Sequence, residues 1–479
     1  MATSQRDAST PFLAAADRLV DELLPMWEGS NNVWRAGWVL DTLVDYFMAR
    51  GEDGSIIQNP LLPVSPTKNG DWWDDFAWVG IATLRAAEMG IFPKQRNELV
   101  KAAINAWTYM HGPGWSRKPT NLAFPFKDLE GWQDFDPSAD RRIGAPNAWA
   151  NIRDTWSPGE PTARQIGERK PRYAPGGVWN APIRDPYSPD VVAANPGCTE
   201  ADVALAPIQN TVTNGLFAIL SLRLALAGAG GAYRDLFEAA DLNLAACQDA
   251  WTNQWSWFMS WIYDTYGEES LALTISPTRF LVRERVSTFH EYEGRRAWDG
   301  GYCSRLAWTG DQGLLLGFLR EVERAGGTMP QRGTGAYRLI VSTVFERAYA
   351  PRRYFGSGAV GMFLLPWLRL GDDNPYGTSP PGGSDYGDYQ TGNGVFMRYL
   401  LQAYRADPTV VDGYAPLVIG AAKQMTEKSF GESVYPPGCC DAYVSIDQCG
   451  DHRPANQMTP LVNRLAVLLM AHEMTSGEA

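Results

Sequence analysis

The chain has 479 residues, of which 45% are hydrophobic and 20% charged, which is typical of a globular protein with a large core and excludes a disordered one. Its 54 acidic and 42 basic residues give a net charge of −12, which repels phosphate backbones and anionic membranes, so neither nucleic acid nor a membrane is expected as a partner. The 19 tryptophans, many in segments rich in Gly and Pro, suit a cleft where sugar rings pack on aromatic faces, although about half would be ordinary core residues.

The N-terminal segment predicts a helix rather than a secretion signal. Asp17, Arg18, Asp21 and Glu22 interrupt its apolar residues, whereas a signal peptide needs an uninterrupted apolar core. No run of 18 or more apolar residues that could span a bilayer follows along the chain. The sequence therefore predicts a cytoplasmic protein, or a secreted one whose leader has been removed.

Apolar residues at spacings of three and four recur along the chain, and long alternating patterns are scarce, which predicts an all-α fold. The predicted helices cover approximately residues 12–26, 33–50, 75–90, 95–111, 207–228, 232–259, 309–325, 336–350, 391–406, 414–428 and 456–473. These are eleven helices. Residues 55–64, where Pro60 and Pro63 limit any helix, leave room for a degenerate helical turn, and counting it gives twelve. Twelve helices joined as six hairpins fit an (α/α)6 toroid, a single domain over residues 1–479 with an inner ring of six helices wrapped by an outer six.

Alternation of outer and inner helices assigns every second one to the inner ring. Each inner helix begins at a polar or Gly-rich cluster: NNVWRAG, WWDDFAW, QNTVTNG, WTGDQG, TGNG and NQMTP. Inner helices of such a ring run parallel, so their N-termini converge at one end, where free N–H groups and polar side chains can line a pocket. Three long excursions, at 112–206, 264–308 and 351–390, are rich in aromatic residues and are expected to form the walls of a cleft.

The densest group of acidic and aromatic residues is NGDWWDDFAWVGIATLRAAEMG, residues 69–90. Acidic residues at a helix start commonly cap free N–H groups, and for a single Asp this role is about as expected as a catalytic one. Capping accounts less well for the adjacent Asp74 and Asp75. Retaining glycoside hydrolysis needs two carboxyl groups about 5 to 5.5 Å apart, which adjacent positions favour. Aromatic neighbours lower the local dielectric and raise the pKa of the carboxyl group that acts as general acid.

The segment WWDDFAWVGIATLRAAE resembles the Asp-Asp and Trp-rich inner helix of glycoside hydrolase family 76, the α-1,6-mannanases. QNTVTNGLFAILSLRLAL (209–226), WTGDQGLLLGFL (308–319) and GNGVFMRYLLQAY (392–404) are similar to other inner helices of that family, in the same order. The 112–206 excursion does not align with the family pattern.

This resemblance implies a retaining α-mannoside hydrolase without a cofactor, in which Asp74 is the nucleophile and Asp75 the acid/base. It also implies that side chains near the starts of the inner helices bind the sugar. These are Asn32, Asp71, Trp72, Trp73, Asn210, Asn214, Trp308, Asp311 and Gln312. Helix capping is the alternative role, about equally expected for Asn214 and less so for Gln312.

Other functions require residue types or spacings that the sequence lacks or has at other positions. Epimerases with the same toroid use histidines for proton transfer, but none of the four histidines begins an inner helix. The Asp71–Asp75 segment is superficially similar to the aspartate motif of class II terpene cyclases, with a spacing wrong by one residue. The six cysteines show no zinc-binding spacing, so no metal site is predicted. A non-catalytic glycan-binding protein would keep the tryptophans without needing both carboxylates.

Overall fold

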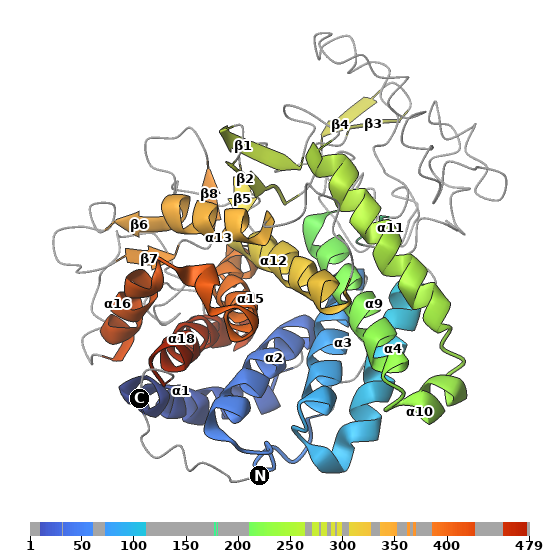
Figure 1. Cartoon of the computed structure of the whole chain (residues 1–479), viewed down its shortest axis with the longest axis horizontal. Coiled ribbons are helices and arrows are strands. Elements are labelled where there is room, and N and C mark those ends of the chain that lie inside the picture. The colour runs from blue at the N-terminus through green and yellow to red at the C-terminus, as the bar shows by residue number, and fades with distance from the viewer. Residues whose placement is uncertain are drawn as a thin grey trace.

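The computed structural model describes sixteen segments of the chain, and the statements below concern these residues. They are 10–30, 32–60, 72–111, 177–178, 180, 210–263, 271–276, 279–284, 289–292, 295–298, 306–326, 336–351, 362–364, 367–369, 386–426 and 454–476. This part of the chain is mostly helical (Figure 1), so the predicted all-α class is confirmed.

Apart from α11, the long helices coincide with the predicted ones to within a few residues. They are α1 (Pro11–Glu28), α2 (Val33–Arg50), α3 (Trp73–Glu88), α4 (Arg96–His111), α9 (Thr211–Ala229), α11 (Leu244–Tyr263), α12 (Thr309–Arg324), α13 (Ala336–Arg347), α15 (Gly392–Ala406), α16 (Ala415–Thr426) and α18 (Pro454–Ser476). Short helical turns are η1 (Pro93–Gln95), α10 (Arg234–Ala239), α14 (Tyr386–Tyr389) and η5 (Pro408–Val411).

Two predicted elements differ from the structure. The helix predicted over 232–259 is divided into α10 and α11, because Asp241 between them has a φ of 51°, a left-handed conformation that cannot continue a right-handed helix. The degenerate helical turn predicted over 55–64 contains no helix over residues 55–60, and residues 61–64 lie outside the described part. The described residues therefore hold eleven long helices and no twelfth between α2 and α3.

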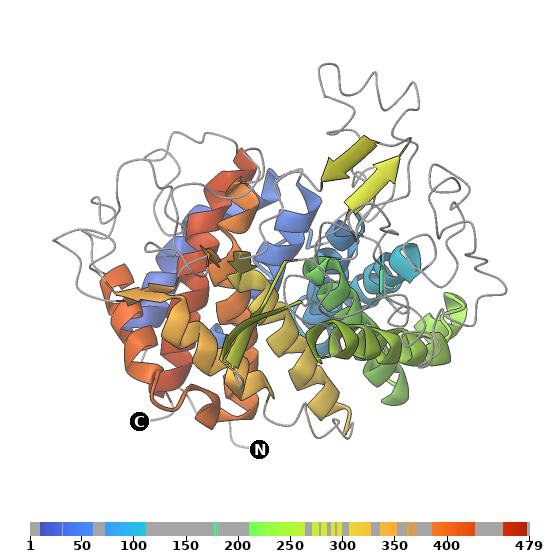
Figure 2. The ribbon, with the colours of Figure 1, turned by 90° about the horizontal axis from the view of Figure 1, so that it is seen from above.

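Six of these helices form a closed ring. Going round it, α2 packs on α3, α3 on α9, α9 on α12, α12 on α15, α15 on α18, and α18 returns to α2. Around them lie α1, which contacts α18 and α2, α4 against α3 and α9, α11 against α9, α13 against α12, and α16 against α18. Figures 1 and 2 show the blue α1 beside the red α18, where the first and last helices of the chain meet.

Two glycines allow the ring helices to approach closely. A Cβ atom on Gly37 of α2 would lie 2.8 Å from the backbone of Trp78 in α3, and one on Gly313 of α12 would lie 2.6 Å from the Cα of Phe396 in α15. Such distances are shorter than van der Waals contact, so any larger residue would push the helices apart.

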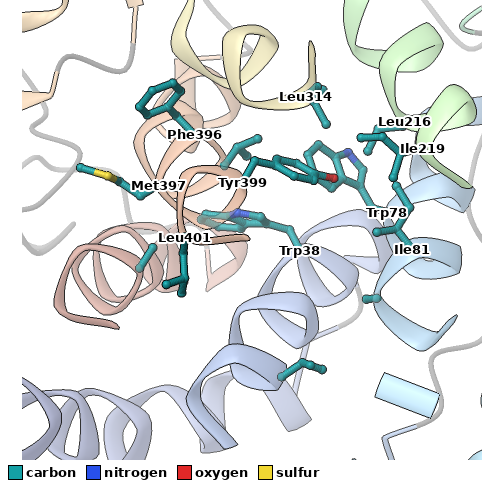
Figure 3. Close-up of a cluster of buried hydrophobic side chains, with 14 of the residues drawn as sticks. Trp38, Trp78, Ile81, Leu216, Ile219, Leu314, Phe396, Met397, Tyr399 and Leu401 are labelled. Atoms are coloured by element: carbon teal, nitrogen blue, oxygen red, sulfur yellow. The ribbon is translucent and has the colours of Figure 1, made fainter. Parts of the chain in front are cut away.

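Side chains from the ring helices fill its interior. Trp38, Trp78 and Tyr399 are buried and lie close together between α2, α3 and α15 (Figure 3). Helix α9 is long and apolar enough to cross a membrane by length and composition, but 78% of its most apolar window is buried in the protein. It is thus explained as a core helix of the ring.

Buried ion pairs also connect the ring helices, toward their C-terminal halves. Arg85 of α3 binds the carboxylates of both Asp41 and Asp45 of α2, the former at 2.7 Å. Arg398 of α15 lies 3.1 Å from the same Asp41 carboxylate. Burial by itself would raise the pKa of Asp41, but the guanidinium groups of Arg398 and Arg85 hold it below its ordinary value. A separate buried pair joins Arg223 of α9 to Glu321 of α12 at 2.6 Å, and Arg405 of α15 binds Asp45 at 2.5 Å.

Short antiparallel strand pairs occupy the described parts of two excursions. The pairs are β1 (Ala272–Ser276) with β2 (Arg279–Val282), β3 (Phe289–Tyr292) with β4 (Arg295–Trp298), β5 (Leu306–Trp308) with β8 (Trp367–Arg369), and β6 (Tyr349–Pro351) with β7 (Met362–Leu364). Of the 112–206 excursion, the structure describes residues 177, 178 and 180.

Candidate active site

The starts of the ring helices are linked to one another at one end of the ring. The N–H of Trp73, the first residue of α3, donates to the carbonyl of Asn180 at 2.8 Å. Two residues earlier, the N–H of Val178 donates to Oδ1 of Asn214 in α9 at 2.7 Å, and the Asn214 amide returns a bond to the Val178 carbonyl at 3.1 Å. The segment 178–180 therefore bridges α3 and α9.

The end of β2 bridges α9 and α12 in the same way. The hydroxyl of Thr211, at the start of α9, donates to the carbonyl of Arg283 at 2.6 Å. Gln312 of α12 accepts a bond from the N–H of Val282 at 2.8 Å and donates to its carbonyl at 2.6 Å.

The remaining links pass through α14 and the two residues after it. The indole of Trp308 donates to the carbonyl of Tyr389 at 2.9 Å. Asn463 of α18 donates to the carbonyl of Gln390 at 2.8 Å. Arg35 of α2 donates to the hydroxyl of Thr459 in α18 at 2.6 Å. The starts of the six ring helices thus lie at one end, as their predicted parallel arrangement requires.

Asp74 and Asp75 lie in the first turn of α3, at this end. Trp72 occupies the N-cap position of α3 without a capping hydrogen bond from its side chain. The Oδ1 atom of Asp74 is buried and has no hydrogen-bond partner within the described part of the chain. Such an atom costs free energy unless a ligand or water satisfies it.

Aromatic residues precede and follow the pair along α3. Trp73 is buried and packs against Phe76 with ring centroids 5.7 Å apart. One turn further along α3, the ring centroid of Trp78 lies 6.2 Å from that of Trp34 in α2. Trp72 is 49% exposed, which leaves an aromatic face beside the carboxylates that is open to a ligand.

The pKa values of both carboxyl groups of the pair are raised, which favours their protonated forms. Burial raises the pKa of Asp74 to about 7, and the negative charge of Asp388 adds to the effect. Burial also raises the pKa of Asp75 well above its ordinary value, with Asp74 and Asp388 as the neighbouring charges that reinforce it. Two adjacent carboxyl groups of this kind titrate together, and near neutral pH the pair can contain one carboxylate and one carboxylic acid.

Several predicted sugar-binding residues have roles at helix starts. Asn32 caps α2 by accepting a bond from the N–H of Arg35 at 3.1 Å, and Asn210 caps α9 through the N–H of Thr213 at 3.1 Å. Trp308 is the N-cap residue of α12, and Asp311 is buried in the first turn of that helix. Asp71 lies outside the described residues.

The amides of Asn214 and Gln312 are occupied by backbone groups. Asn214 bonds both polar groups of Val178 and the carbonyl of Asn210, and Gln312 bonds both polar groups of Val282 and the carbonyl of Trp308. An amide side chain has two donor hydrogens, and both are used here. In this structure the two side chains hold the backbone of the loops, and their role in sugar binding stays a prediction.

We expect the Gln312→Ala variant to lose stability rather than sugar affinity, because the buried N–H and carbonyl of Val282 would each lose a partner. The expected loss in the free energy of unfolding is about 1–3 kcal/mol, measured by chemical denaturation. The exposed Gln248 of α11 provides the matched control, and Gln248→Ala should have little effect. A Gln312→Ala protein of unchanged stability with weakened glycan binding would contradict the scaffold role.

Two charged residues at this end were not among the predicted site residues. Arg35 is buried, and its guanidinium donates to Oδ1 of Asp388 at 2.6 Å. Arg35 belongs to the cluster NNVWRAG at the start of an inner helix, and Asp388 to the excursion at 351–390. A charged residue within such a cluster or excursion was the available signal for each.

His472 and the described cysteine lie away from this end. His111 lies near it, because the ring centroid of Tyr109, two residues earlier in α4, is 5.4 Å from that of Phe76 near the start of α3. His290 belongs to β3. His111 ends α4 and stacks on Trp107 with centroids 4.3 Å apart, and His472 lies late in α18, where its ring shares a hydrogen bond with the hydroxyl of Thr10. Burial raises the pKa of the Cys247 thiol to about 12, so it is unreactive at neutral pH. No group of three or more His, Cys, Asp or Glu placed to hold a metal ion occurs among the residues with described positions. His452 and the other five cysteines are outside them.

No protein-family model matches the sequence, and no curated protein sequence does either. Solved structures share the fold over nearly the whole chain. The α-1,6-mannanase GH76A of Salegentibacter sp. HEL1_6 has a TM-score of 0.51 at 14% identity, covering 96% of this chain and 99% of that one. An inactive variant of it, with two consecutive aspartates changed to alanine and α-1,6-mannotetrose bound, has a TM-score of 0.50 at 15% identity with the same coverage.

A third structure with the same fold is Dfg5 from Chaetomium thermophilum in complex with glucosamine. Its TM-score is 0.50 at 14% identity, and the match covers 98% of this chain and 92% of that one. At such identities the likeness is one of fold.

Proposed function

We propose that the chain is a retaining glycoside hydrolase that acts on α-1,6-linked mannosides, built on an (α/α)6 toroid with Asp74 and Asp75 as its catalytic pair. The observation that carries the proposal is the buried, unpartnered Oδ1 of Asp74 beside a second carboxyl group whose pKa is raised, at the end of the ring where the helix starts meet. Paired carboxyl groups with separated protonation states are the requirement of glycoside hydrolysis.

The fold likeness supports the assignment of the pair. The similar mannanase is inactive when two consecutive aspartates are replaced. This chain contains consecutive aspartates at 74–75 and at 372–373. The first pair lies at the start of a ring helix, and the second lies outside the described residues.

The proposed reaction assigns a different role to each carboxyl group. The Asp74 carboxylate attacks the anomeric carbon while Asp75 donates its proton to the glycosidic oxygen, so the bond to the leaving sugar breaks and a glycosyl ester forms on Asp74. The Asp75 carboxylate then removes a proton from water, which attacks the same carbon and releases the sugar with its configuration retained. Asp75 suits the acid role because burial and two neighbouring negative charges favour its protonated form. The exposed indole of Trp72 can pack against a sugar ring,.

A glycan panel tests the proposal. Mannotetraoses with α-1,6, α-1,3 or α-1,2 linkages are incubated with the protein, and products are separated by mass. We expect the α-1,6 oligosaccharide to be cleaved and the first product anomer, observed by ¹H NMR, to be the α form. The Asp74→Asn/Asp75→Asn double variant is the inactive control. Binding without cleavage would instead favour a glycan-binding protein, and a product of unchanged mass would favour an isomerase.

A further inference from the structure

The segment from α14 to Thr391 is fixed at the site end of the ring by side chains of two ring helices. Trp308 of α12 donates to the carbonyl of Tyr389, and Asn463 of α18 donates to the carbonyl of Gln390. The hydroxyl of Thr391 donates to the carbonyl of Asp388 at 2.6 Å. These bonds hold the backbone at Asp388 and at the two residues after it, so its side chain projects from a defined place.

A buried arginine then orients the Asp388 side chain. The guanidinium of Arg35 donates to Asp388 Oδ1 and to the hydroxyl of Thr459, both at 2.6 Å, and lies 4.6 Å from the ring centroid of Trp34. The Arg35 side chain is 2% exposed, whereas that of Asp388 is 53% exposed. The carboxylate therefore has one oxygen held by a buried cation, while about half of the Asp388 side chain is exposed.

The same contacts connect Asp388 to the candidate catalytic pair. Trp34, on which the Arg35 guanidinium lies, packs against Trp78. Trp78 is one turn beyond Asp74 and Asp75 on α3. Arg35, with Asp388 bound to it, therefore lies on the side of α2 that packs against the first turns of α3, at the same end of the ring as the pair.

We propose that Asp388 is a positioning residue of the candidate active site, whose negative charge keeps a proton on the Asp74–Asp75 pair and whose place is set by Arg35. This inference rests on the proposed function. Like charges in one site disfavour simultaneous ionisation. Burial is the largest cause of the raised pKa of each pair member, and the Asp388 charge adds a smaller upward effect on both. The acid that donates the proton thus depends on a residue that does not belong to the pair.

The charged groups around this end are few within the described segments. They include Asp74 and Asp75 on α3, Arg35 on α2, Asp388 on α14, Asp311 on α12, Arg283 and Glu284 at the end of β2, and the titratable His111 at the end of α4, which packs on α3. Glu284 accepts a hydrogen bond from the hydroxyl of Tyr389 at 2.6 Å. Replacing Asp388 removes from this cluster the charge that acts on both Asp74 and Asp75.

The Asp388→Asn variant tests the inference through the pH profile of kcat/KM on an α-1,6-mannooligosaccharide. Without the negative charge, both pair members ionise more readily, so both limbs of the profile should move to lower pH. Arg35→Gln removes the buried cation bound to Asp388 and should move the profile to higher pH. Asp53→Asn, beyond the opposite end of α2 and exposed, should leave it unchanged. A raised KM with an unmoved profile in Asp388→Asn would overturn the proposal and make Asp388 a sugar ligand.

A second measurement does not need turnover, so it separates this inference from the proposed function. The raised pKa values of Asp74 and Asp75 mean that the folded protein binds more protons than the unfolded chain. Stability from these groups is complete below about pH 4 and is lost as pH rises through their folded pKa values. The decline in Tm between pH 5 and pH 8 should be smaller in Asp388→Asn than in wild type. An equal decline in a folded variant would overturn the inference even if no glycan is cleaved.

Discussion

Asp74→Asn should abolish cleavage of every α-mannoside, whereas the loss in Asp75→Asn should depend on the leaving group. An amide cannot act as the nucleophile, so changing Asp74 removes the first step whatever the substrate. The proton from Asp75 is needed only when the departing oxygen is basic. We therefore expect Asp75→Asn to lower kcat/KM by about 10²–10⁴-fold on an α-1,6-mannooligosaccharide, and far less on a 2,4-dinitrophenyl α-1,6-mannobioside, as measured by initial rates.

Azide and thermal unfolding provide the controls for these two variants. Azide should restore turnover of the activated substrate by Asp75→Asn, because it needs no general base to attack the glycosyl ester. Both variants should be at least as stable as wild type at pH 8, since Asn removes a buried carboxyl group whose ionisation opposes folding. Asp372→Asn/Asp373→Asn, at the other consecutive pair of the sequence, is the matched control. Activity that survives in Asp74→Asn but disappears in this control would reject the assigned pair.

Among single substitutions in the ring helices, we expect Arg85→Met to be the most destabilising. Arg85 is buried and binds two buried carboxylates on the neighbouring helix, those of Asp41 and Asp45. Removing one member of a buried ion pair leaves charge uncompensated and costs about 3–5 kcal/mol. We expect a loss of this size in the free energy of unfolding, measured by denaturant titration at neutral pH.

Two variants define the origin of that loss. Arg50→Met removes a partly exposed ion-pairing arginine from the end of α2, and should cost less than about 1 kcal/mol. Adding Asp41→Asn and Asp45→Asn to Arg85→Met removes the carboxylate partners that Arg398 and Arg405 still have, and should lower the stability further,. If Arg85→Met unfolds no more easily than Arg50→Met, the buried ion pairs do not stabilise the ring.

The helices were predictable because their signals are local. Asn32 caps α2, and Gly51 ends it with a φ of 68°, so apolar periodicity and the two end residues define this helix without any distant contact. The break at Asp241 was missed because a left-handed φ in a residue other than Gly has no strong sequence signal. The Asp74–Asp75 pair could be found from sequence because its acidic and aromatic residues are consecutive.

The sequence by itself determined which segments are helices and which carboxyl groups are candidates for catalysis, because both depend on residues within a few positions of each other. The tertiary structure decided which distant residues the polar side chains contact. It showed that the Asn214 and Gln312 amides hold loops, and that Arg35 orients Asp388 across 353 positions of sequence. Such partners come together only when the ring closes, since local periodicity contains no information about contacts between distant helices.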